Sequence, residues 1–218
     1  LKVAFANEIG NICKAVGIDG HKVMEIFCQD TKLNLSSYYM KPGFAFGGSC
    51  LPKDVRALNY KAKSLDLDLP VLNSIMPSNQ RQIEKAIHMI VNKNNRKIGI
   101  LGFAFKAGTD DLRESPVVDV IEYLIGKGYE LKLYDKNVNL AALTGANRDY
   151  ILNHIPHISK LMVSDFKEVL EFAETLVIGN GSEEFKSVPA NLKPGQVVID
   201  LVRIVKEQSG ERYDGICW

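Results

Sequence analysis

The hydrophobic pattern of this sequence changes its period once, at the polar run Asn92–Asn95. Before that run, apolar residues recur every three or four positions, which predicts helices. After it, short apolar runs such as Lys97–Leu101 alternate with helical stretches. Alternating strands and helices favour parallel βαβ units with right-handed crossovers. We therefore predict an α/β chain with an all-helical domain at residues 1–95 and a small, doubly wound parallel-sheet domain at residues 96–218.

Four helices are predicted in the first domain. The first covers residues 1–16, Asp19 caps the second, Pro52 lies at the first position of the third, and Pro70 opens the fourth. Pro77 lies inside the fourth pattern, so either one long helix is kinked there or Pro77 starts a new helix. The first pattern begins without an initiator methionine or a cap, and we therefore expect a piece of a longer protein.

In the second domain, strands are predicted where short apolar runs are bounded by turn residues. Ser115 is expected to cap a helix that begins at Pro116, and Asp165 to cap another. Residues 138–155 have a helical pattern that we expect to lie on the surface. The five predicted strands are Lys97–Leu101, Glu130–Tyr134, Leu161–Val163, Leu176–Ile178 and Val197–Ile199.

The composition argues against several functional classes. Lys and Arg number 27 against 26 Asp and Glu, so the net charge of +1 gives no electrostatic basis for binding nucleic acid or a membrane surface. No apolar run is long enough to span a bilayer, and no signal-peptide pattern is recognisable. The four cysteines lack metal-finger spacing, so we expect reduced thiols in a cytoplasmic protein. His154 and His157 have no third ligand nearby, and no metal site is predicted.

The stretch Pro42–Asp54 carries the first chemical signal. Its three glycines let the backbone approach a ligand closely. Cys50 lies just before the helix that Pro52 opens, where free N–H groups and the helix dipole favour an anion. Lys53 adds a positive charge, and together these features favour a reactive thiolate. Two interpretations stay open: Cys50 is a nucleophile, or it is a buried structural cysteine beside a glycine turn.

The loop Gly102–Pro116 carries the second signal, because it follows the first predicted strand. Ligands bind at the carboxyl ends of the strands in an open parallel sheet. Lys106 and Arg113 offer two cations there for a phosphate or a carboxylate, and a surface ion-pair cluster with the neighbouring aspartates is the alternative. The loop lacks the spacing of a GxGxxG fingerprint, so Asp135 after the second strand is weak support for a dinucleotide site.

These stretches, GFAFGGSCLPKD and GFAFKAGTDDLRESP, together with the opening KVAFANEIGNI, resemble the UDP-glucose/GDP-mannose dehydrogenase family. The similarity extends over essentially the whole chain. It implies an NAD-dependent, four-electron oxidation of the C6 alcohol of a nucleotide sugar to a carboxylate. GDP-mannose is the expected substrate and UDP-glucose the alternative, with a role in alginate or other exopolysaccharide biosynthesis. The second domain would be Rossmann-like and would bind the nucleotide sugar.

The resemblance also implies roles for individual residues. Cys50 would attack the aldehyde-level carbon, and the thiohemiacetal would give up a second hydride before the thioester is hydrolysed. Lys53 and Arg113 would contact NAD, and Asp54 would orient the hydrolytic water. The residues implied to contact the nucleotide sugar are Asn7, Tyr38, Tyr39, Lys41, Phe44, Gly47 and Lys106.

Two residues depart from the family pattern. Lys41 stands where the GDP-mannose enzymes are expected to have arginine, which keeps the charge but loses the planar fork. Pro77 is unusual in what is normally a long interdomain helix. The resemblance further implies an N-terminal dinucleotide-binding domain upstream of this sequence and a homodimer or higher homo-oligomer through the helical domain. A different class of function stays open, in which the chain alone is a non-catalytic nucleotide-sugar-binding or dimerisation module.

Overall fold

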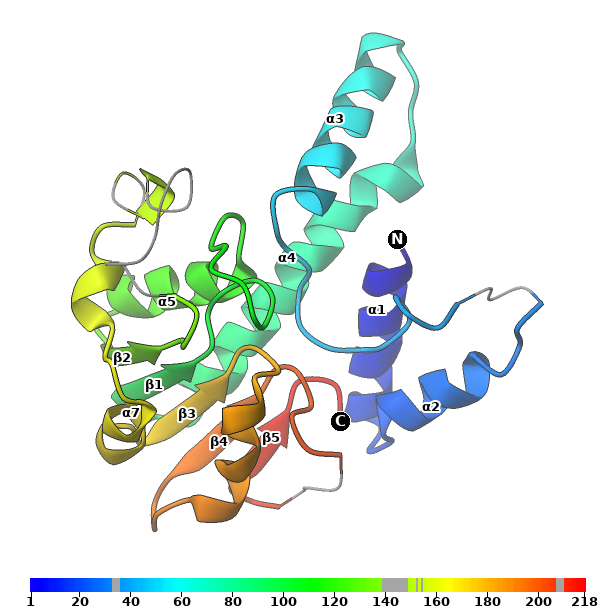
Figure 1. Ribbon diagram of the computed structural model, residues 1–218. Helices are drawn as coiled ribbons and strands as arrows, with labels where there is room; N and C mark the ends of the chain where they lie inside the picture. The colour runs from blue at the N-terminus through cyan, green and yellow to red at the C-terminus, as the bar shows by residue number, and fades with distance from the viewer. Residues whose placement is uncertain (33–35, 139–148, 152, 154, 207–209) are drawn as a thin grey trace.

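The computed structural model describes residues 1–218 except 33–35, 139–148, 152, 154 and 207–209. A helical part is followed by a part built on a five-stranded parallel sheet (Figure 1). In Figure 1 the third helix projects away from the sheet, whereas the first two helices lie beyond the sheet edge that carries the C-terminus. The predicted α/β class is confirmed, and the division into domains at residues 95 and 96 stays a prediction.

The predicted helices of the first part are all present. Asp19 caps the second helix as expected, because its carboxylate accepts hydrogen bonds from the N–H groups of His21 (2.9 Å) and Lys22 (3.4 Å). The fourth helix is continuous over 22 residues with Pro77 inside it, so the single-helix alternative is correct. The bounds are α1 (Lys2–Ala15), α2 (Gly20–Phe27), α3 (Leu51–Ser64) and α4 (Pro70–Val91).

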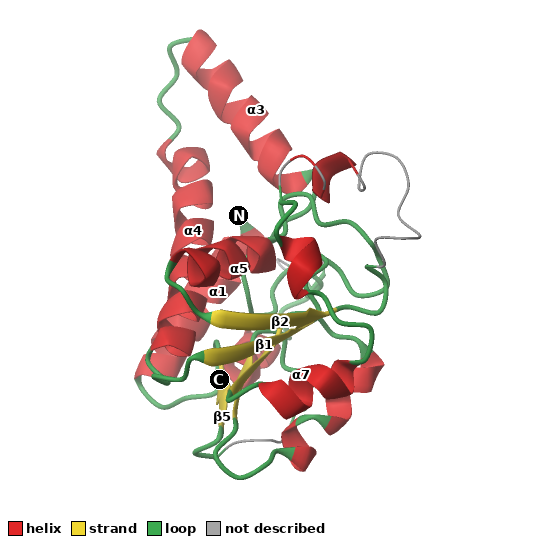
Figure 2. Ribbon diagram, turned by 90° about the vertical axis from the view of Figure 1, so that its left-hand side faces the viewer, coloured by secondary structure: helices red, strands yellow, loops and turns green. Residues whose placement is uncertain are grey.

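The sheet has the strand order β2-β1-β3-β4-β5, and every neighbouring pair is parallel. Helices α4 and α5 (Pro116–Gly126) cover one face, and α7 (Phe166–Phe172) covers the other (Figure 2). Burial on both faces is what the predicted doubly wound fold requires. The strands are β1 (Lys97–Leu101), β2 (Glu130–Tyr134), β3 (Thr175–Ile178), β4 (Val197–Asp200) and β5 (Tyr213–Gly215).

The register brings the carboxyl ends of the central strands to one level. Leu101 of β1 pairs with Tyr134 of β2 and with Ile178 of β3, and Ile178 pairs with Asp200 of β4. The loops that follow these strands therefore meet at one edge of the sheet. Three short 3-10 helices complete the described elements: η1 (Ile158–Leu161), η2 (Glu183–Ser187) and η3 (Pro189–Asn191).

One predicted strand is absent, and one observed strand was not predicted. Residues 161–163 do not form a strand: η1 ends at Leu161, and Met162 forms only one isolated bridge, to Leu133. Most of the pattern at residues 138–155 lies outside the described residues, so the helical, surface-exposed segment stays a prediction; Val138, Ile151 and Ile155, which are described, are buried. The strand β5 was not predicted, because a three-residue strand containing Asp and Gly has no apolar run to reveal it.

Two helix starts also differ in detail. Helix α3 begins at Leu51, so Pro52 takes the second position, because the backbone of Cys50 already has αR dihedral angles. Ser115 occupies the N-cap position of α5 but its hydroxyl makes no cap. It donates instead to the carbonyl of Phe103 (2.8 Å), across the loop that joins β1 to α5.

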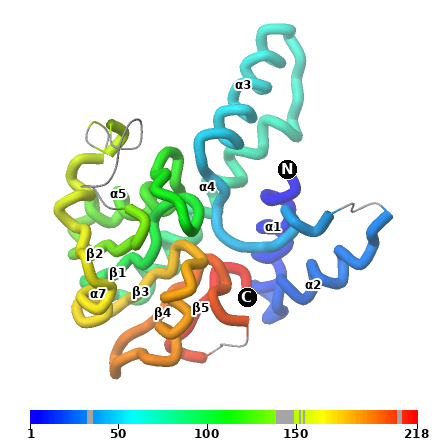
Figure 3. The backbone as a smooth tube through the Cα atoms, in the orientation of Figure 1, coloured from blue at the N-terminus to red at the C-terminus, as the bar shows by residue number. Residues whose placement is uncertain are grey.

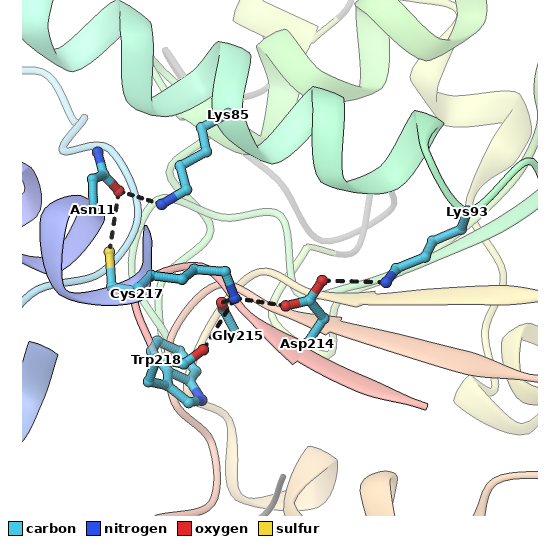
Figure 4. A network of polar contacts seen from close by, with 8 residues as sticks. Asn11, Lys85, Lys93, Asp214, Gly215, Cys217 and Trp218 are labelled. Carbon is cyan, nitrogen blue, oxygen red and sulfur yellow. Dashed lines mark hydrogen bonds and ion pairs between the residues drawn. The ribbon is translucent and has the colours of Figure 1, made fainter. Parts of the chain in front are cut away.

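The C-terminal segment joins the sheet to the helical part. The Lys14 ammonium of α1 lies 2.7 Å from the Asp214 carboxylate and also donates to the carbonyls of Gly215 and Trp218. Lys93 contacts the other oxygen of Asp214 at 3.2 Å (Figure 4). Burial raises the pKa of Asp214, but the hydrogen bonds and charges of these two lysines outweigh it and the net shift is downward.

Candidate active site

The loop that carries Cys50 runs from the α2 side of the molecule past α1 and up to α3 (Figure 3). Cys50 is a free, exposed cysteine at the N-cap position of α3. Its exposure contradicts the interpretation as a buried structural cysteine, and its role as a nucleophile stays a prediction. Cys50 thus lies at the positive end of a 14-residue helix, although its side chain makes no hydrogen bond to the first turn.

The two stretches that the sequence singled out touch each other. The Gly48 N–H donates to the Glu114 carbonyl at 3.2 Å. A Cβ atom on Gly47 would lie 2.2 Å from that same oxygen, and one on Gly48 would lie 2.8 Å from the Phe105 ring. Gly48 also has a φ of +84°, which favours glycine. Glycine is therefore required at both positions for the cysteine loop to approach the loop that follows β1.

A salt bridge connects α3, the helix that follows Cys50, to the loop between β1 and α5. The Arg56 guanidinium on α3 donates two hydrogen bonds to Glu114, at 2.5 and 3.1 Å. Glu114 itself has a φ of 54°, in the left-handed region that non-glycine residues rarely adopt. This pair connects α3 directly to the residues that lead into α5.

Arg113 interacts electrostatically with Cys50. Its guanidinium contacts both carboxylate oxygens of Asp111 at 2.8 Å, so the ion-pair alternative is present for these two residues. The pKa of Arg113 is raised first by the hydrogen bonds to Asp111, and the nearby Cys50 sulfur raises it further. The same hydrogen bonds lower the pKa of Asp111. With 39% of its side chain exposed, Arg113 remains open to a ligand as well.

Lys53 and Asp54 occupy the first turn of α3, directly after the thiol. Both side chains are 66% exposed, and their charged groups are 3.6 Å apart. Lys106 is also exposed. It lies in a turn in which its carbonyl accepts hydrogen bonds from the N–H and the hydroxyl of Thr109. An exposed pair of this kind contributes little to stability, so these side chains remain available for ligands.

A cleft of about 270 Å³ lies between the cysteine loop and the carboxyl edge of the sheet. Lys41 and Phe44 line it from the cysteine loop, Phe105 from the loop after β1, and Gly179 and Leu201 from the ends of β3 and β4. This is the edge where open parallel sheets bind ligands. The structure thus brings two of the predicted substrate residues to the predicted edge of the sheet.

A second cavity of about 450 Å³ adjoins this cleft, and Lys41 and Val202 line both. His21 and Arg203 also border it. Burial, and then the charge of Arg203, lower the pKa of His21 to about 4. Lys41 therefore contributes a positive charge to the wall of both the cleft and the second cavity.

Other predicted substrate residues lie elsewhere. Asn7 is buried, and its amide holds the loop backbone, accepting from the Gly43 N–H (2.9 Å) and donating to the Phe44 carbonyl (3.2 Å). Tyr38 and Tyr39 are exposed and pack edge to face, with ring centroids 5.0 Å apart. None of these three lines the described part of the cleft.

Asp135 has a structural role. Its buried carboxylate accepts hydrogen bonds from the N–H groups of Phe103 and Ala104 and from the Asn180 side chain, each at 3.0 Å. These bonds occupy the N–H groups at the start of the loop after β1, which also lacks the glycine spacing of a dinucleotide fingerprint. The described residues of this sheet do not form a dinucleotide site.

Comparisons with known families agree with this geometry. A family model described as the central domain of the UDP-glucose/GDP-mannose dehydrogenase family matches residues 1–81. Another, described as the UDP binding domain of the same family, matches residues 99–207. The chain belongs to the UDP-glucose/GDP-mannose dehydrogenase family.

Individual members of this dehydrogenase family match the whole chain. It is 56% identical to GDP-mannose 6-dehydrogenase of Pseudomonas aeruginosa and 52% identical to that of Azotobacter vinelandii, covering 100% of the chain and 50% of each relative. A solved ternary complex of GDP-mannose dehydrogenase from Pseudomonas aeruginosa has a TM-score of 0.80, again over 100% of this chain and 50% of that one. A UDP-glucose dehydrogenase from Pyrobaculum islandicum has a TM-score of 0.83 at 28% identity, over 100% of this chain and 48% of that one. The chain thus spans about half the length of the relatives it matches.

The part of this family member that the structure describes has neither a metal-binding cluster nor a membrane-spanning helix. There, no three His, Cys, Asp or Glu residues are grouped so that they could hold a metal ion. His154 lies outside the described residues, and His157 is 3.8 Å from Glu122. Nor does any described helix combine the length and the apolar character needed to cross a bilayer.

Three residues that hold the loop were not predicted. Asn79 and Gln82, on α4, hydrogen-bond the backbone of Phe46 and Gly43. The one signal in the sequence is that both polar residues fall on the apolar face of α4 that contains Ile83. Nothing in the sequence near Arg56 indicates its pairing, because its partner Glu114 is 58 residues away.

Proposed function

We propose that this chain forms the nucleophile-bearing and nucleotide-sugar-binding half of an NAD-dependent GDP-mannose 6-dehydrogenase. The observation that carries the proposal is the exposed thiol of Cys50 at the start of α3, on a loop whose Gly48 N–H donates to the Glu114 carbonyl in the loop after β1. The 56% identity with GDP-mannose 6-dehydrogenase of Pseudomonas aeruginosa supports this substrate over UDP-glucose. UDP-glucose stays the alternative, because the family model over residues 99–207 is described as UDP-binding.

Cys50 is the group that makes the second oxidation possible. Once the C6 alcohol has become an aldehyde, the thiolate adds to its carbonyl carbon and forms a thiohemiacetal. Loss of a hydride from that carbon gives a thioester, and water then releases the carboxylate and regenerates the thiol. Cys50 lies at the positive end of α3, where the helix dipole favours negative charge. Asp54, in the first turn, is placed to orient the water.

The nucleotide end of the substrate is proposed to occupy the cleft between the cysteine loop and the sheet. Lys41 and Lys106 supply positive charge for the diphosphate. Phe44 supplies an apolar wall, and Gly47 keeps the loop close to the sheet. Tyr38 and Tyr39 are exposed rather than in the cleft. We propose that they and Asn7 reach the nucleotide sugar only in an assembly of two chains or after the loop moves.

NAD accepts the two hydrides when it is bound. The described sheet does not supply its site, because Asp135 occupies the N–H groups at the start of the loop after β1 and that loop lacks the glycine fingerprint. We propose that Lys53 and Arg113 contact the cofactor from this chain, since both are exposed cations, one in the turn after Cys50 and the other interacting with it electrostatically. The dinucleotide-binding domain that the family resemblance implies would provide the rest of the site.

The exposed apolar surface supports self-association. Among the described residues, the large apolar and aromatic side chains that are exposed all lie in residues 1–71 except Phe105 and Tyr123. Exposed patches of this kind mark interaction surfaces. We therefore propose a homodimer or higher homo-oligomer through α1 to α3. As an isolated module the chain would bind and associate without catalysing the oxidation.

The test is a calorimetric titration of the purified chain with GDP-mannose and, separately, with UDP-glucose. GDP-mannose should bind more tightly, and replacing Lys41 by Ala should weaken that binding. A chain that binds neither nucleotide sugar would contradict the proposed site, and tighter binding of UDP-glucose would reverse the choice of substrate.

A further inference from the structure

Three buried side-chain amides hold the segment that leads to Cys50. Asn79 accepts from the Phe46 N–H at 2.9 Å and donates to the Phe46 carbonyl at 2.8 Å. Asn7 makes the same two kinds of bond to Gly43 and Phe44, and Gln82 donates to the Gly43 carbonyl. The exposed fractions of Asn7, Asn79 and Gln82 are only 4%, 6% and 1%.

These bonds replace those that a helix or strand would provide. Residues 43–46 belong to neither kind of element, so their N–H and C=O groups have no regular backbone partner. Leaving such groups unpaired in a partly buried position is destabilising. Because a side-chain amide has both a donor and an acceptor, Asn79 satisfies both groups of Phe46 at once. Phe46 directly precedes the glycine pair that leads to Cys50, so its position limits where the thiol can lie.

Gln82 is itself held from two sides. Its Oε1 accepts from the Asn11 side chain at 2.9 Å, and its Nε2 lies 3.4 Å from the Cys217 sulfur. Lys85 donates to Asn11, which also lies 3.7 Å from Cys217 (Figure 4). Burial raises the pKa of Cys217 and keeps its thiol protonated. The amide of Gln82 is thus fixed in the orientation that holds Gly43, with support from α1 and the C-terminal segment.

We propose that Asn79 and Gln82 are positioning residues for Cys50. They act through the loop backbone and keep the thiol at the positive end of α3, where it interacts electrostatically with Arg113. The proposal rests on the proposed role of Cys50 as the nucleophile. Neither side chain touches the cleft between the loop and the sheet, so their loss displaces the thiol without removing a cleft-lining group.

The test compares two alkylating reagents, iodoacetate and iodoacetamide, on the whole chain at one fixed pH. Local positive charge speeds the anionic reagent relative to the neutral one. The rate of each is followed at the Cys50 peptide by mass spectrometry, with the Cys28 peptide as an internal reference. The variants are Asn79→Ala and Gln82→Met. The matched control is Gln196→Met, since Gln196 also donates to two backbone carbonyls at 2.7 Å but lies on the far side of the sheet domain.

The ratio of the iodoacetate rate to the iodoacetamide rate at Cys50 should fall about threefold in Asn79→Ala and in Gln82→Met. It should stay unchanged in Gln196→Met and at Cys28, although the thermal stability of all three variants falls. A wild-type ratio at Cys50 in a folded Asn79→Ala or Gln82→Met chain would overturn the proposal. Either variant decides the question if the other fails to fold. Alkylation needs no substrate, so this result is independent of whether the chain binds GDP-mannose.

Discussion

Lys106 lies on the loop after β1, exposed and next to the edge where the cleft opens. Replacing it by Ala should weaken binding of GDP-mannose about tenfold, because a charge-assisted hydrogen bond to phosphate is lost. Binding of NAD should weaken less. Both dissociation constants can be measured on the complete dehydrogenase, with Lys61→Ala on α3 as the control. An equal or larger loss for NAD would show that this loop serves the cofactor instead.

His21 makes the stability of the chain depend on pH. Its ring packs edge-on against Trp218, and its Nε2 has no hydrogen-bond partner among the described residues. Burial, and then Arg203, lower its pKa from 6.5 to about 4, while Asp19 opposes them. Between these two values the unfolded chain binds a proton that the folded chain does not. The free energy of unfolding should therefore fall by about 2 kcal/mol as the pH falls from 6.5 to 4.

Replacing His21 by Phe should remove most of that decrease. Urea unfolding across this pH range measures it, and His88→Phe is the matched control, since His88 is exposed. A decrease of the same size in the His21→Phe chain would assign the pH dependence to other groups.

At single residues, sequence reasoning identified the candidate groups for chemistry more readily than the groups that hold their loops in place. Cys50 and Arg113 could be predicted because glycine spacing and strand order mark their loops. Asp19 could be predicted as a cap because the signal lies within three residues. The role of Asn79 could not, since its partner Phe46 is 33 residues away and a place on the apolar face of α4 does not identify that partner.

Between elements, the Arg56–Glu114 pair is the direct link from α3 to the start of α5. Arg56→Ala should lower the free energy of unfolding by about 0.5–1 kcal/mol, since both side chains are roughly half exposed. The control is Arg81→Ala, which breaks a pair with Glu84 within α4 alone. Urea unfolding of the two variants gives the comparison. A smaller loss for Arg56→Ala than for Arg81→Ala would mean that the link does not hold the two elements together.

Long helices and strands could be predicted from the period of their hydrophobic residues. Helix α4 and strand β1 were predicted within a residue or two because several turns or a fully apolar run reveal them. The apolar run at residues 161–163 was misassigned, since η1 takes up Leu161 and only one isolated bridge, from Met162 to Leu133, joins the run to the edge strand β2. Short elements such as β5 depend on pairing with distant strands, which local pattern does not show.

For the molecule as a whole, the chain should fold but show no dehydrogenase activity alone. Its buried residues form cores on both faces of the sheet, and α4 joins one of them through Ile83, Ala86 and Ile90. Hydride transfer needs bound NAD, and the described residues form no dinucleotide site. NADH absorbance with GDP-mannose and NAD tests this, with the complete dehydrogenase as the positive control. NADH formation by the purified chain would contradict the assignment of NAD to another domain.

The same chain should self-associate through its exposed helical surface. Sedimentation velocity should show a dimer or larger species, and replacing Leu58 and Tyr60 by Ser should shift it toward monomer, because both side chains are more than half exposed on α3. A monomer at all concentrations in the wild-type chain would contradict the proposed interface.

The central claim is that Cys50 is the nucleophile of the second oxidation. The most direct measurement is product analysis of the complete dehydrogenase carrying Cys50→Ser, with Cys28→Ser as the control. Serine is a far poorer nucleophile near neutral pH without a dedicated base. Formation of the GDP-sugar carboxylate should therefore be lost in Cys50→Ser and retained in Cys28→Ser. Wild-type formation of the carboxylate by the Cys50→Ser enzyme would contradict the covalent mechanism.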